Sequence, residues 1–261
     1  MNVVITTAGK GNSTLNEEVY RTAKLLNAQP IVRGTHSIEA LMNQYEADIL
    51  VIGKKRYTWY PLGGGEPVFF HPNGAMFRLK RLLKGELDSF VVATGLSEGM
   101  SIIDCTLGLG ADSIVASHSV GESGYVRSLE VHPLLAFLVQ HGLQTYESNV
   151  IEIENAMRRV NVVNANYHNY LQELDDNSFD VVYFDPMFTA GAIESDGIKA
   201  IKQVAFYEPI TNEIINQAKR VARKRVVLKD HYRSSRFEQF GFVQQKRKTS
   251  SIHFGVLEVN E

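Results

Sequence analysis

Residues 181–188 combine an apolar run with an acidic residue, a proline and an aromatic residue, in the order Val-Val-Tyr-Phe-Asp-Pro-Met-Phe. Such a run is typical of a buried strand, and open parallel sheets bind ligands where their strands end. Asp185 and the Pro186 carbonyl can accept hydrogen bonds from an exocyclic amine there, while Phe188 can stack on a planar ring. We therefore predict a site that selects an amino group on a base. The alternative is a turn in which the Asp caps a helix and the Pro ends a strand.

A glycine-rich turn at residues 104–112, Asp-Cys-Thr-Leu-Gly-Leu-Gly-Ala-Asp, lies where a strand is expected to meet a helix. Gly108 and Gly110 permit a sharp bend and a close approach to a ligand, and the helix N-terminus offers free N–H groups. Ser113 stands where a dinucleotide fingerprint has its third glycine, which argues against a pyrophosphate cofactor.

Polar residues that can bind a nucleoside accompany this turn. Asp104 can accept a hydrogen bond from a bound amine, and Glu130, at the end of the next expected strand, is placed for ribose hydroxyls. Asn166 and Tyr167 follow a third expected strand and suit an adenine edge and its ring, although both are also ordinary turn residues.

The elements that must hold these residues alternate between strands and helices. Strands are predicted over 101–105, 125–130, 160–164, 179–184 and 225–229, and helices over 76–83, 111–119, 133–146 and 208–221. This alternation predicts an α/β, Rossmann-like parallel sheet covered on both faces. Residues 242–248 and 252–259 predict instead a C-terminal antiparallel hairpin, which brings the sheet to seven strands.

A second, smaller α/β unit is expected at the N-terminus. The first 53 residues read as strand, helix, strand, helix, strand, and the Gly/Pro-rich stretch at 61–67 then breaks the pattern. We therefore predict two domains, at 1–65 and 66–261.

The net charge of -2 conceals a segregation of basic residues. Residues 54–84 carry seven Lys/Arg and one Glu, and residues 216–248 carry eleven Lys/Arg against two acidic residues. The segregation predicts a polyanionic partner, and the rings among the cations of 54–60 suggest stacking with nucleobases. The alternative is that these cations cover solvated surfaces.

Several classes of protein are excluded by composition. The single Cys105 rules out an intramolecular disulfide framework and a Cys-based zinc cluster, and the eight histidines lack ligand-like spacing, so we expect no metal. No apolar run approaches the roughly 18 residues of a membrane helix, and the N-terminus lacks a signal-peptide layout. We therefore expect a cytoplasmic protein without membrane contact.

The motifs at 104–112, Glu130, 185–188 and 226–229 resemble those of class I S-adenosylmethionine-dependent methyltransferases. They are most similar to the RsmJ-like family, whose named member methylates the N2 amine of a guanine in small-subunit ribosomal RNA. Residues 70–76, Phe-His-Pro-Asn-Gly-Ala-Met, and the basic helix after them also match that family. In two places the sequence departs from it: Ala111 replaces a usual Arg, and Thr-Ala-Gly at 189–191 replaces a Pro-basic stretch.

The resemblance implies S-adenosyl-L-methionine as the cofactor and RNA, specifically small-subunit ribosomal RNA, as the partner. The residues expected to bind the cofactor are Asp104, Thr106, Gly108, Gly110, Ala111, Asp112, Glu130, Val131, Asn166, Tyr167 and Asp185. The expected catalytic residues are Asp185, Pro186 and Phe188, and the expected RNA-binding residues are Arg78, Lys80, Arg81 and Lys229.

Two other functions remain open from the sequence. A non-catalytic RNA-binding or ribosome-assembly protein with a decayed cofactor site would keep the basic windows. A nicotinamide-dependent oxidoreductase would share the glycine turn and Glu130, but it predicts no aromatic box at Asp185. The oligomeric state stays open.

Overall fold

The chain divides into two compact units between His71 and Pro72 in a computed structural model that describes residues 2–9, 13–186 and 209–259. The sequence placed this boundary six residues earlier, between 65 and 66. Residues up to His71 stay with the first unit because Val68 pairs with Trp59, each main-chain N–H donating to the other's carbonyl at 2.8 Å.

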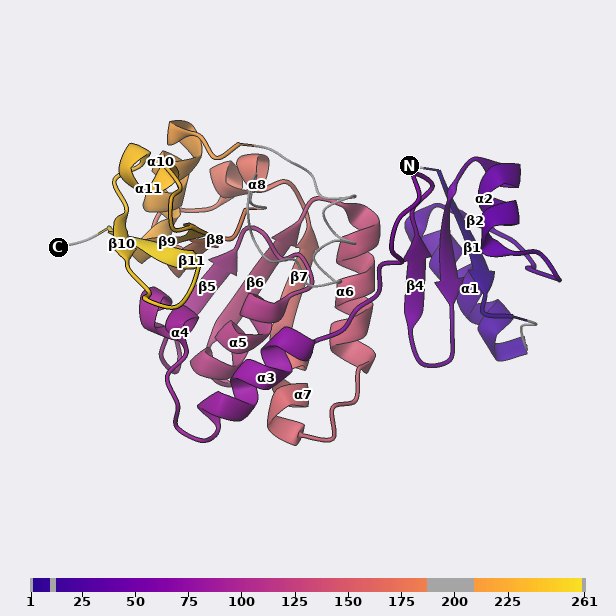
Figure 1. Cartoon of the computed structure of the whole chain (residues 1–261), viewed down its shortest axis with the longest axis horizontal. Helices are drawn as coiled ribbons and strands as arrows, with labels where there is room; N and C mark the ends of the chain where they lie inside the picture. Colours follow the sequence, from indigo (N-terminus) through magenta and orange to yellow (C-terminus); the bar gives the residue numbers. More distant parts are fainter. Residues whose placement is uncertain (1, 10–12, 187–208, 260–261) are drawn as a thin grey trace. The chain divides into compact units, whose positions relative to one another are not determined.

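The N-terminal unit is a four-stranded sheet in the order β2-β1-β3-β4 (Figure 1). Its elements are β1 (Val3–Thr7), α1 (Ser13–Leu26), β2 (Gln29–Pro30), α2 (Ile38–Tyr45), β3 (Asp48–Ile52) and β4 (Tyr57–Tyr60). The first three strands are parallel and β4 runs antiparallel to β3. The predicted small α/β unit is therefore confirmed, with β4 as an addition that the sequence reading missed.

Strand β4 corrects the expectation that the rings of residues 54–60 stack on nucleobases. Tyr57 and Trp59 are only 7% and 1% exposed, because they lie on the face of β4 that packs into the unit. The Tyr57 hydroxyl donates to Glu18 at 2.5 Å, and Arg56 lies over the ring of Phe69. These aromatic residues therefore serve the core of the N-terminal unit.

The second unit is built on a seven-stranded sheet in the order β10-β11-β9-β8-β5-β6-β7. Its strands are β5 (Ser101–Asp104), β6 (Tyr125–Glu130), β7 (Val160–Asn164), β8 (Phe179–Phe184), β9 (Ala222–His231), β10 (Val243–Gln245) and β11 (Ile252–Glu258). β11 is antiparallel to both of its neighbours, and the pairings from β9 to β7 are all parallel. The predicted seven-stranded Rossmann-like sheet with a C-terminal hairpin is confirmed.

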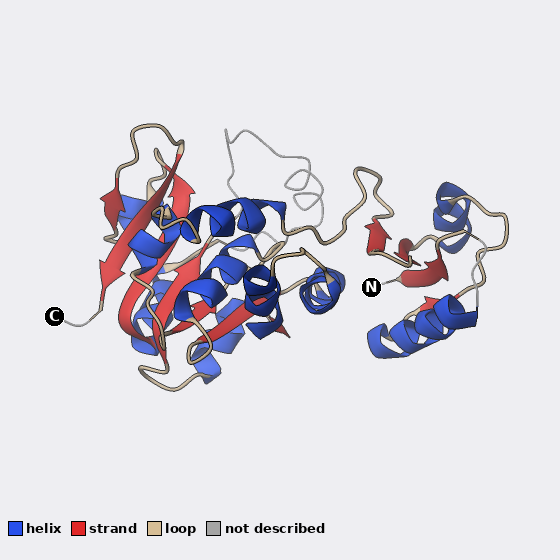
Figure 2. Cartoon of the chain, turned by 90° about the horizontal axis from the view of Figure 1, so that it is seen from below, coloured by secondary structure: helices blue, strands red, loops and turns tan. Residues whose placement is uncertain are grey.

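Helices cover both faces of this sheet (Figures 1 and 2). They are α3 (Asn73–Leu82), α4 (Ser89–Thr94), α5 (Ala111–Val120), α6 (Pro133–Thr145), α7 (Ile151–Arg159), α8 (Tyr167–Glu173), α10 (Asn212–Val221) and α11 (Arg236–Gln239). Local signals set several of their ends. Asp88 caps α4 by accepting from the N–H groups of Phe90 and Val91, and Pro133 opens α6, where its missing N–H costs nothing.

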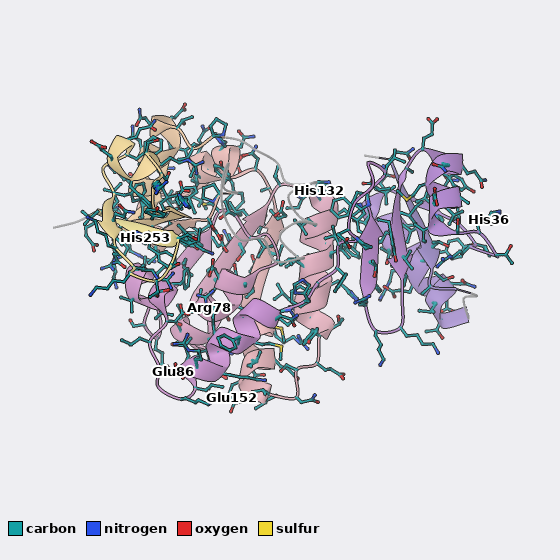
Figure 3. All side chains as sticks on the ribbon, in the orientation of Figure 1. His36, Arg78, Glu86, His132, Glu152 and His253 are labelled. Carbon is teal, nitrogen blue, oxygen red and sulfur yellow. The ribbon has the colours of Figure 1, made fainter. Side chains whose placement is uncertain are left out.

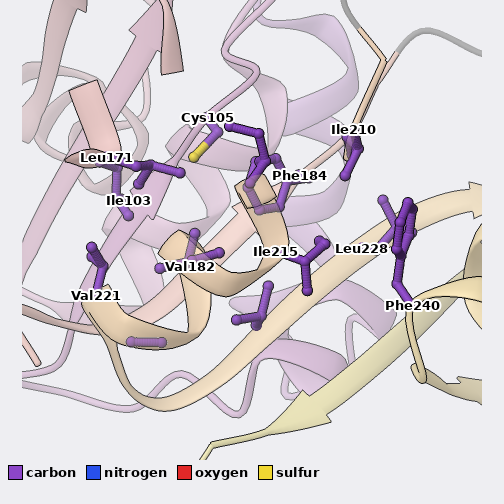
Figure 4. Packing of buried hydrophobic residues seen from close by; sticks show 14 of the residues in the cluster. Ile103, Cys105, Leu171, Val182, Phe184, Ile210, Ile215, Val221, Leu228 and Phe240 are labelled. Atoms are coloured by element: carbon purple, nitrogen blue, oxygen red, sulfur yellow. The ribbon is translucent and has the colours of Figure 1, made fainter. Parts of the chain in front are cut away.

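The buried core explains why β8 reads as an apolar run. Val182 and Phe184 are fully buried on the face covered by α8, α10 and α11, together with Ile215 and Leu228 (Figure 4). Tyr183 points to the other face, where its ring meets Phe90 edge-on at 4.9 Å. Burying each large apolar side chain contributes about 1.5–3 kcal/mol, so β8 is held firmly on both faces up to the residue before Asp185. Within the described ranges, no helix is both long enough and apolar enough to cross a membrane.

Candidate active site

The register of the parallel strands gathers acidic and basic residues at the carboxyl edge of the large sheet. Asp104 ends β5 opposite Tyr183, and Asp185 follows β8 beside Lys229 of β9. The Nζ atom of Lys229 lies 2.6 Å from Oδ2 of Asp185. The sequence predicted a site at the ends of β5 and β8, and the structure brings the two strand ends side by side.

Thr106 joins the two strand ends. Its main-chain N–H donates to Oδ1 of Asp104 at 3.0 Å, and its hydroxyl oxygen accepts the N–H of Asp185 at 2.6 Å. Oδ2 of Asp104 accepts the hydroxyl of Ser113 at 2.5 Å. The turn after β5 and the segment after β8 are therefore held in a fixed relation, with Asp185 and Pro186 extending from it.

A chain of ion pairs lies beneath Asp185. Asp112 of α5 accepts from Lys229 at 2.9 Å, from Arg78 at 2.5 Å and from the hydroxyl of Tyr183 at 2.8 Å. Arg78 is also bound through two nitrogens to Asp88, both at 2.8 Å. We call the residues Asp185, Lys229, Asp112, Arg78 and Asp88 the ion-pair chain; a bidentate pair of this kind fixes a guanidinium group in one orientation.

Burial and charge act differently on the two aspartates that share Lys229. Burial opposes the charge of Asp112, but Lys229 and Arg78 outweigh that effect and hold its pKa well below its usual range. Burial raises the pKa of Asp185 to about 6, although Lys229 opposes the rise and Asp112 adds to it. Oδ2 of Asp185 is bound to Lys229, while Oδ1 has no hydrogen-bond donor among the described residues.

The bend at Gly108 and Gly110 is one that other residues would adopt only with strain, since φ is +52° and +78°. Among the described residues, a Cβ at Gly108 would meet no atom closer than the carbonyl oxygen of Thr106 at 4.0 Å. A Cβ at Gly110 would lie 3.3 Å from Leu107 and 3.5 Å from Val139. Gly110 is therefore favoured by its positive φ together with a close contact to Leu107, whereas the described residues leave room for a Cβ beside Gly108.

Glu130 faces this bend from the end of β6. Its Oε1 accepts the N–H of His132 at 2.9 Å, and the N–H of Gly108 also donates to the carboxylate. Burial nevertheless raises its pKa to about 7, and burial likewise raises the pKa of Asp104 to about 7. A ligand hydroxyl that donates to Glu130 would favour its charged form.

The loop after β7 lies beside Glu130. Asn164, which the sequence reading left out of its set of site residues, donates to the carbonyls of Glu130 at 2.7 Å and Val131 at 3.0 Å. Asn166 caps α8 by accepting the N–H of His168, and the Tyr167 ring packs edge-on against Phe184 at 5.7 Å. The position of Asn164 at the end of a predicted strand was the available signal in the sequence. Only the pairing of β6 with β7 shows that its side chain binds the main chain of Glu130 and Val131.

The four residues expected to bind RNA lie in two different settings. Lys80 and Arg81 are exposed on α3, where Arg81 pairs with Glu86 at 2.7 Å. Arg78 and Lys229 have side chains only 22% and 23% exposed and belong to the ion-pair chain. Phe188, expected to stack on a base, lies outside the described residues, and Ala111 is the first residue of α5.

A family model described as "Putative SAM-dependent methyltransferase" matches residues 67–255 of the chain. The chain belongs to this family. A solved SAM-dependent methyltransferase from Neisseria gonorrhoeae has the same fold, with a TM-score of 0.63 and 18% identity over 98% of this chain and 95% of that one. The family match extends from before β5 into β11, and S-adenosylmethionine is accordingly the cofactor of this methyltransferase.

Two further proteins are similar to this chain in sequence. "Uncharacterized protein YpiP" of Bacillus subtilis is 45% identical over 257 residues, which cover 98% of this chain and 100% of that protein. "Ribosomal RNA small subunit methyltransferase J" of Haemophilus influenzae (strain PittEE) is 32% identical over 164 residues, 60% of this chain and 61% of that protein.

The residues at the glycine bend fit S-adenosylmethionine. The described residues leave room for a ligand beside Gly108, α5 begins directly after the bend, and Glu130 is a partly buried acceptor that lacks a cation partner among the described residues. This donor and acceptor set suits an uncharged nucleoside with ribose hydroxyls. No group of three or more potential metal ligands occurs within the part of the chain that the structure describes.

Proposed function

We propose that this methyltransferase transfers a methyl group to the exocyclic N2 amine of a guanine in small-subunit ribosomal RNA. The observation that carries the proposal is the setting of Asp185. One carboxylate oxygen is bound to Lys229, the other lacks a donor among the described residues, and Thr106 ties the main chain to the glycine-bend turn. The relative from Haemophilus influenzae, named as a ribosomal RNA methyltransferase, supports the choice of RNA.

The chemistry asks the protein mainly for alignment. S-adenosylmethionine supplies a methyl group already activated by a sulfonium, so a C–N bond forms as the C–S bond breaks. Oδ1 of Asp185 and the carbonyl of Pro186 accept the two N–H bonds of the amine and direct its lone pair. After transfer the nitrogen carries an extra proton, which Oδ1 of Asp185 accepts and passes to water.

The other site residues predicted from the sequence would bind the cofactor or hold its binding site in shape. The bend at Gly108 and Gly110 would hold the cofactor's methionine part, and Glu130 would accept hydrogen bonds from its ribose hydroxyls. Val131, Asn166 and Tyr167 border the adenine. Asp104 and Thr106 hold the bend against Asp185.

The sequence predicted that Arg78 and Lys229 contact RNA directly. We assign the ion-pair chain, to which both belong, the role of positioning Asp185 instead. Lys229 donates to Asp185 and Asp112 together, so its ammonium group is committed to two carboxylates. Arg78 anchors Asp112 to Asp88 in the same way. We assign Lys229 the task of orienting Asp185 and keeping it charged, and Arg78 and Asp112 the task of holding Lys229.

Two isosteric substitutions test the proposal: Asp185→Asn, directly after β8, and Asp180→Asn, near the start of the same strand. Asp185→Asn should lower tritiated methyl incorporation into small-subunit ribosomal RNA by about 10²–10⁴-fold, because it removes the proton acceptor. The RNA is taken from a strain lacking the gene. S-adenosylmethionine affinity, measured by calorimetry, should stay within about tenfold. Asp180→Asn, at the start of β8, is the matched control and should retain full activity.

The outcomes separate the competing functions. Full activity of Asp185→Asn would exclude the role given to Asp185. Digestion of the labelled RNA should place the label in N2-methylguanosine, and label in another nucleoside would exclude the guanine amine. A wild-type protein that binds RNA but not the donor would be the non-catalytic alternative.

A further inference from the structure

The structure divides the basic window at 216–248 between the two edges of the large sheet. At the amino edge four of the cations pair with carboxylates: Arg220 with Asp176 at 2.6 Å, Arg225 with Glu258 at 3.0 Å, and Arg223 and Lys224 with Asp180 at 3.5 and 3.6 Å. These pairs account for that part of the window as surface ion pairs within the fold.

The cations at the carboxyl edge lack such pairs. Arg233, Lys246, Arg247 and Lys248 are exposed, and none of them forms an ion pair with a carboxylate of the described residues. Two other cations of this edge are neutralised: Lys229 by Asp112 and Asp185, and Arg236 by Asp230 at 3.1 Å. The window therefore leaves four uncompensated cations on one side of the molecule.

The antiparallel hairpin places these cations at the edge that holds Asp185. Because β11 runs against β9, its first residue Ile252 pairs with His231, the last residue of β9. The loop from β10 to β11, which carries Lys246 to Lys248, therefore lies where the parallel strands end. A parallel last strand would have put the preceding loop at the opposite edge.

Hydrogen bonds fasten the β10–β11 loop to the turn after β9. The N–H of Tyr232 donates to the carbonyl of Ser251 at 2.9 Å, and the side chain of Gln244 donates to the carbonyl of Tyr232 at 2.8 Å. Nε2 of His253, which is 6% exposed, lies 3.2 Å from the main-chain N and 3.1 Å from the main-chain O of Arg247 (Figure 3). These contacts hold the two segments as one surface.

We call this the carboxyl-edge basic surface; it comprises Tyr232, Arg233, Lys246, Arg247 and Lys248. The Tyr232 ring is 40% exposed, and the guanidinium of Arg233 lies 5.1 Å from its centre. Cations interleaved with an exposed ring are the composition that binds single-stranded nucleic acid, through phosphates and base stacking.

The carboxyl-edge basic surface lies on the substrate half of the edge. Asp185 follows β8, and β11 is two strands away in the order β8-β9-β11, a lateral separation of about 10 Å at the usual strand spacing. The glycine bend and Glu130 belong to β5 and β6, on the other side of β8. A base held at Asp185 would therefore leave its flanking nucleotides close to this surface.

We propose that the carboxyl-edge basic surface binds the RNA backbone next to the target base and thereby raises the affinity for RNA. The inference rests on the proposed function, since it takes RNA as the substrate. It also gives the C-terminal hairpin a function, because only an antiparallel β11 brings this loop to the reactive edge.

The test removes two charges at each edge of the sheet. Lys246→Gln/Lys248→Gln should weaken binding to a fluorescein-labelled single-stranded RNA oligonucleotide by about tenfold at 100 mM salt and reduce the slope of log K against log salt by about 1.4. Adding Arg233→Gln should reduce the slope by a further 0.7 or so. Arg223→Gln/Lys224→Gln, at the amino edge, is the matched control and should change neither quantity.

S-adenosylmethionine affinity is measured for every variant to confirm that the cofactor site is intact, and it should stay unchanged. Equal losses at both edges, or no loss at the carboxyl edge while the wild type binds and methylates RNA, would overturn the inference and leave the proposed function standing. A wild type that binds the donor but neither binds nor methylates RNA would overturn both.

Discussion

Asp180 is the second residue of β8 and Asp185 directly follows the strand, and the pKa values of the two aspartates are shifted in opposite directions. Burial opposes ionisation of Asp180, but hydrogen bonds from Ser101 and the nearby Arg223 and Lys224 outweigh burial and lower its pKa. Burial dominates at Asp185 and raises the pKa to about 6, even with Lys229 at 2.6 Å. The surroundings therefore stabilise the charged form of Asp180, whereas they raise the pKa of Asp185 toward neutral pH.

The difference extends to the two edges of the sheet. In the ion pairs of the amino edge the cationic side chains are about a quarter to a half exposed, so water still solvates their charges. At the carboxyl edge Asp104 and Glu130 have pKa values raised to about 7. Perturbed carboxylates of this kind cluster at functional sites. The ion pairs of the amino edge therefore lie in water-exposed positions, whereas the carboxyl edge holds carboxylates whose pKa values burial shifts toward neutral pH.

The largest expected effect comes from breaking the ion-pair chain. Asp112→Ala should lower the free energy of unfolding in urea by about 3 kcal/mol, because it leaves buried charge on Lys229 and Arg78 without its shared partner. Asp176→Ala, which breaks an exposed pair at the amino edge, is the control and should cost less than about 1 kcal/mol. Equal losses would contradict the contrast between the edges.

An intermediate effect is expected from the titration of Glu130. Ribose hydroxyls favour its charged form, so S-adenosylmethionine binding should release a proton, and affinity should rise with pH through the pKa of about 7. Between pH 6 and pH 8 the gain is about tenfold, measured by calorimetry. Glu130→Gln should bind more weakly and show no such rise. A wild-type affinity independent of pH would contradict the role of Glu130.

The smallest effect is expected at the amino edge. Lys224→Ala removes an exposed cation 3.6 Å from Asp180, and it should change the free energy of unfolding by less than about 1 kcal/mol. Methyl transfer should be unaffected, since the residue lies at the far end of β9 from Lys229. A loss of activity without loss of stability would show that the amino edge also contributes to function.

Much of the large sheet could be predicted from the sequence. The bounds of β6, β7 and β8 match the predicted strands, because short runs of β-branched and aromatic residues are a local signal. The helices α4, α7 and α8 were not predicted. They have six, nine and seven residues, and tertiary packing rather than a long apolar period stabilises them.

The candidate site could be predicted in part. Asp104, Glu130 and Asp185 were found because each lies at or directly after the end of a predicted strand, and the ends of parallel strands meet at one edge. The engagement of Lys229 and Arg78 by Asp112 could not be found, because those residues lie far apart in sequence and only the register of β8 and β9 and the packing of α3 on α5 bring them together.

The sequence by itself determined the alternation of strands and helices, the glycine bend and the residue types at the strand ends, since these depend on neighbours along the chain. Only the tertiary structure decided which charges are neutralised. The fold buries Tyr57 and Trp59 in the core of the N-terminal unit. It binds Lys229 to two carboxylates and leaves the cations at 246–248 exposed. The reason is physical: the pairing and burial of a charge depend on what packs against it, and strand order and direction set those contacts.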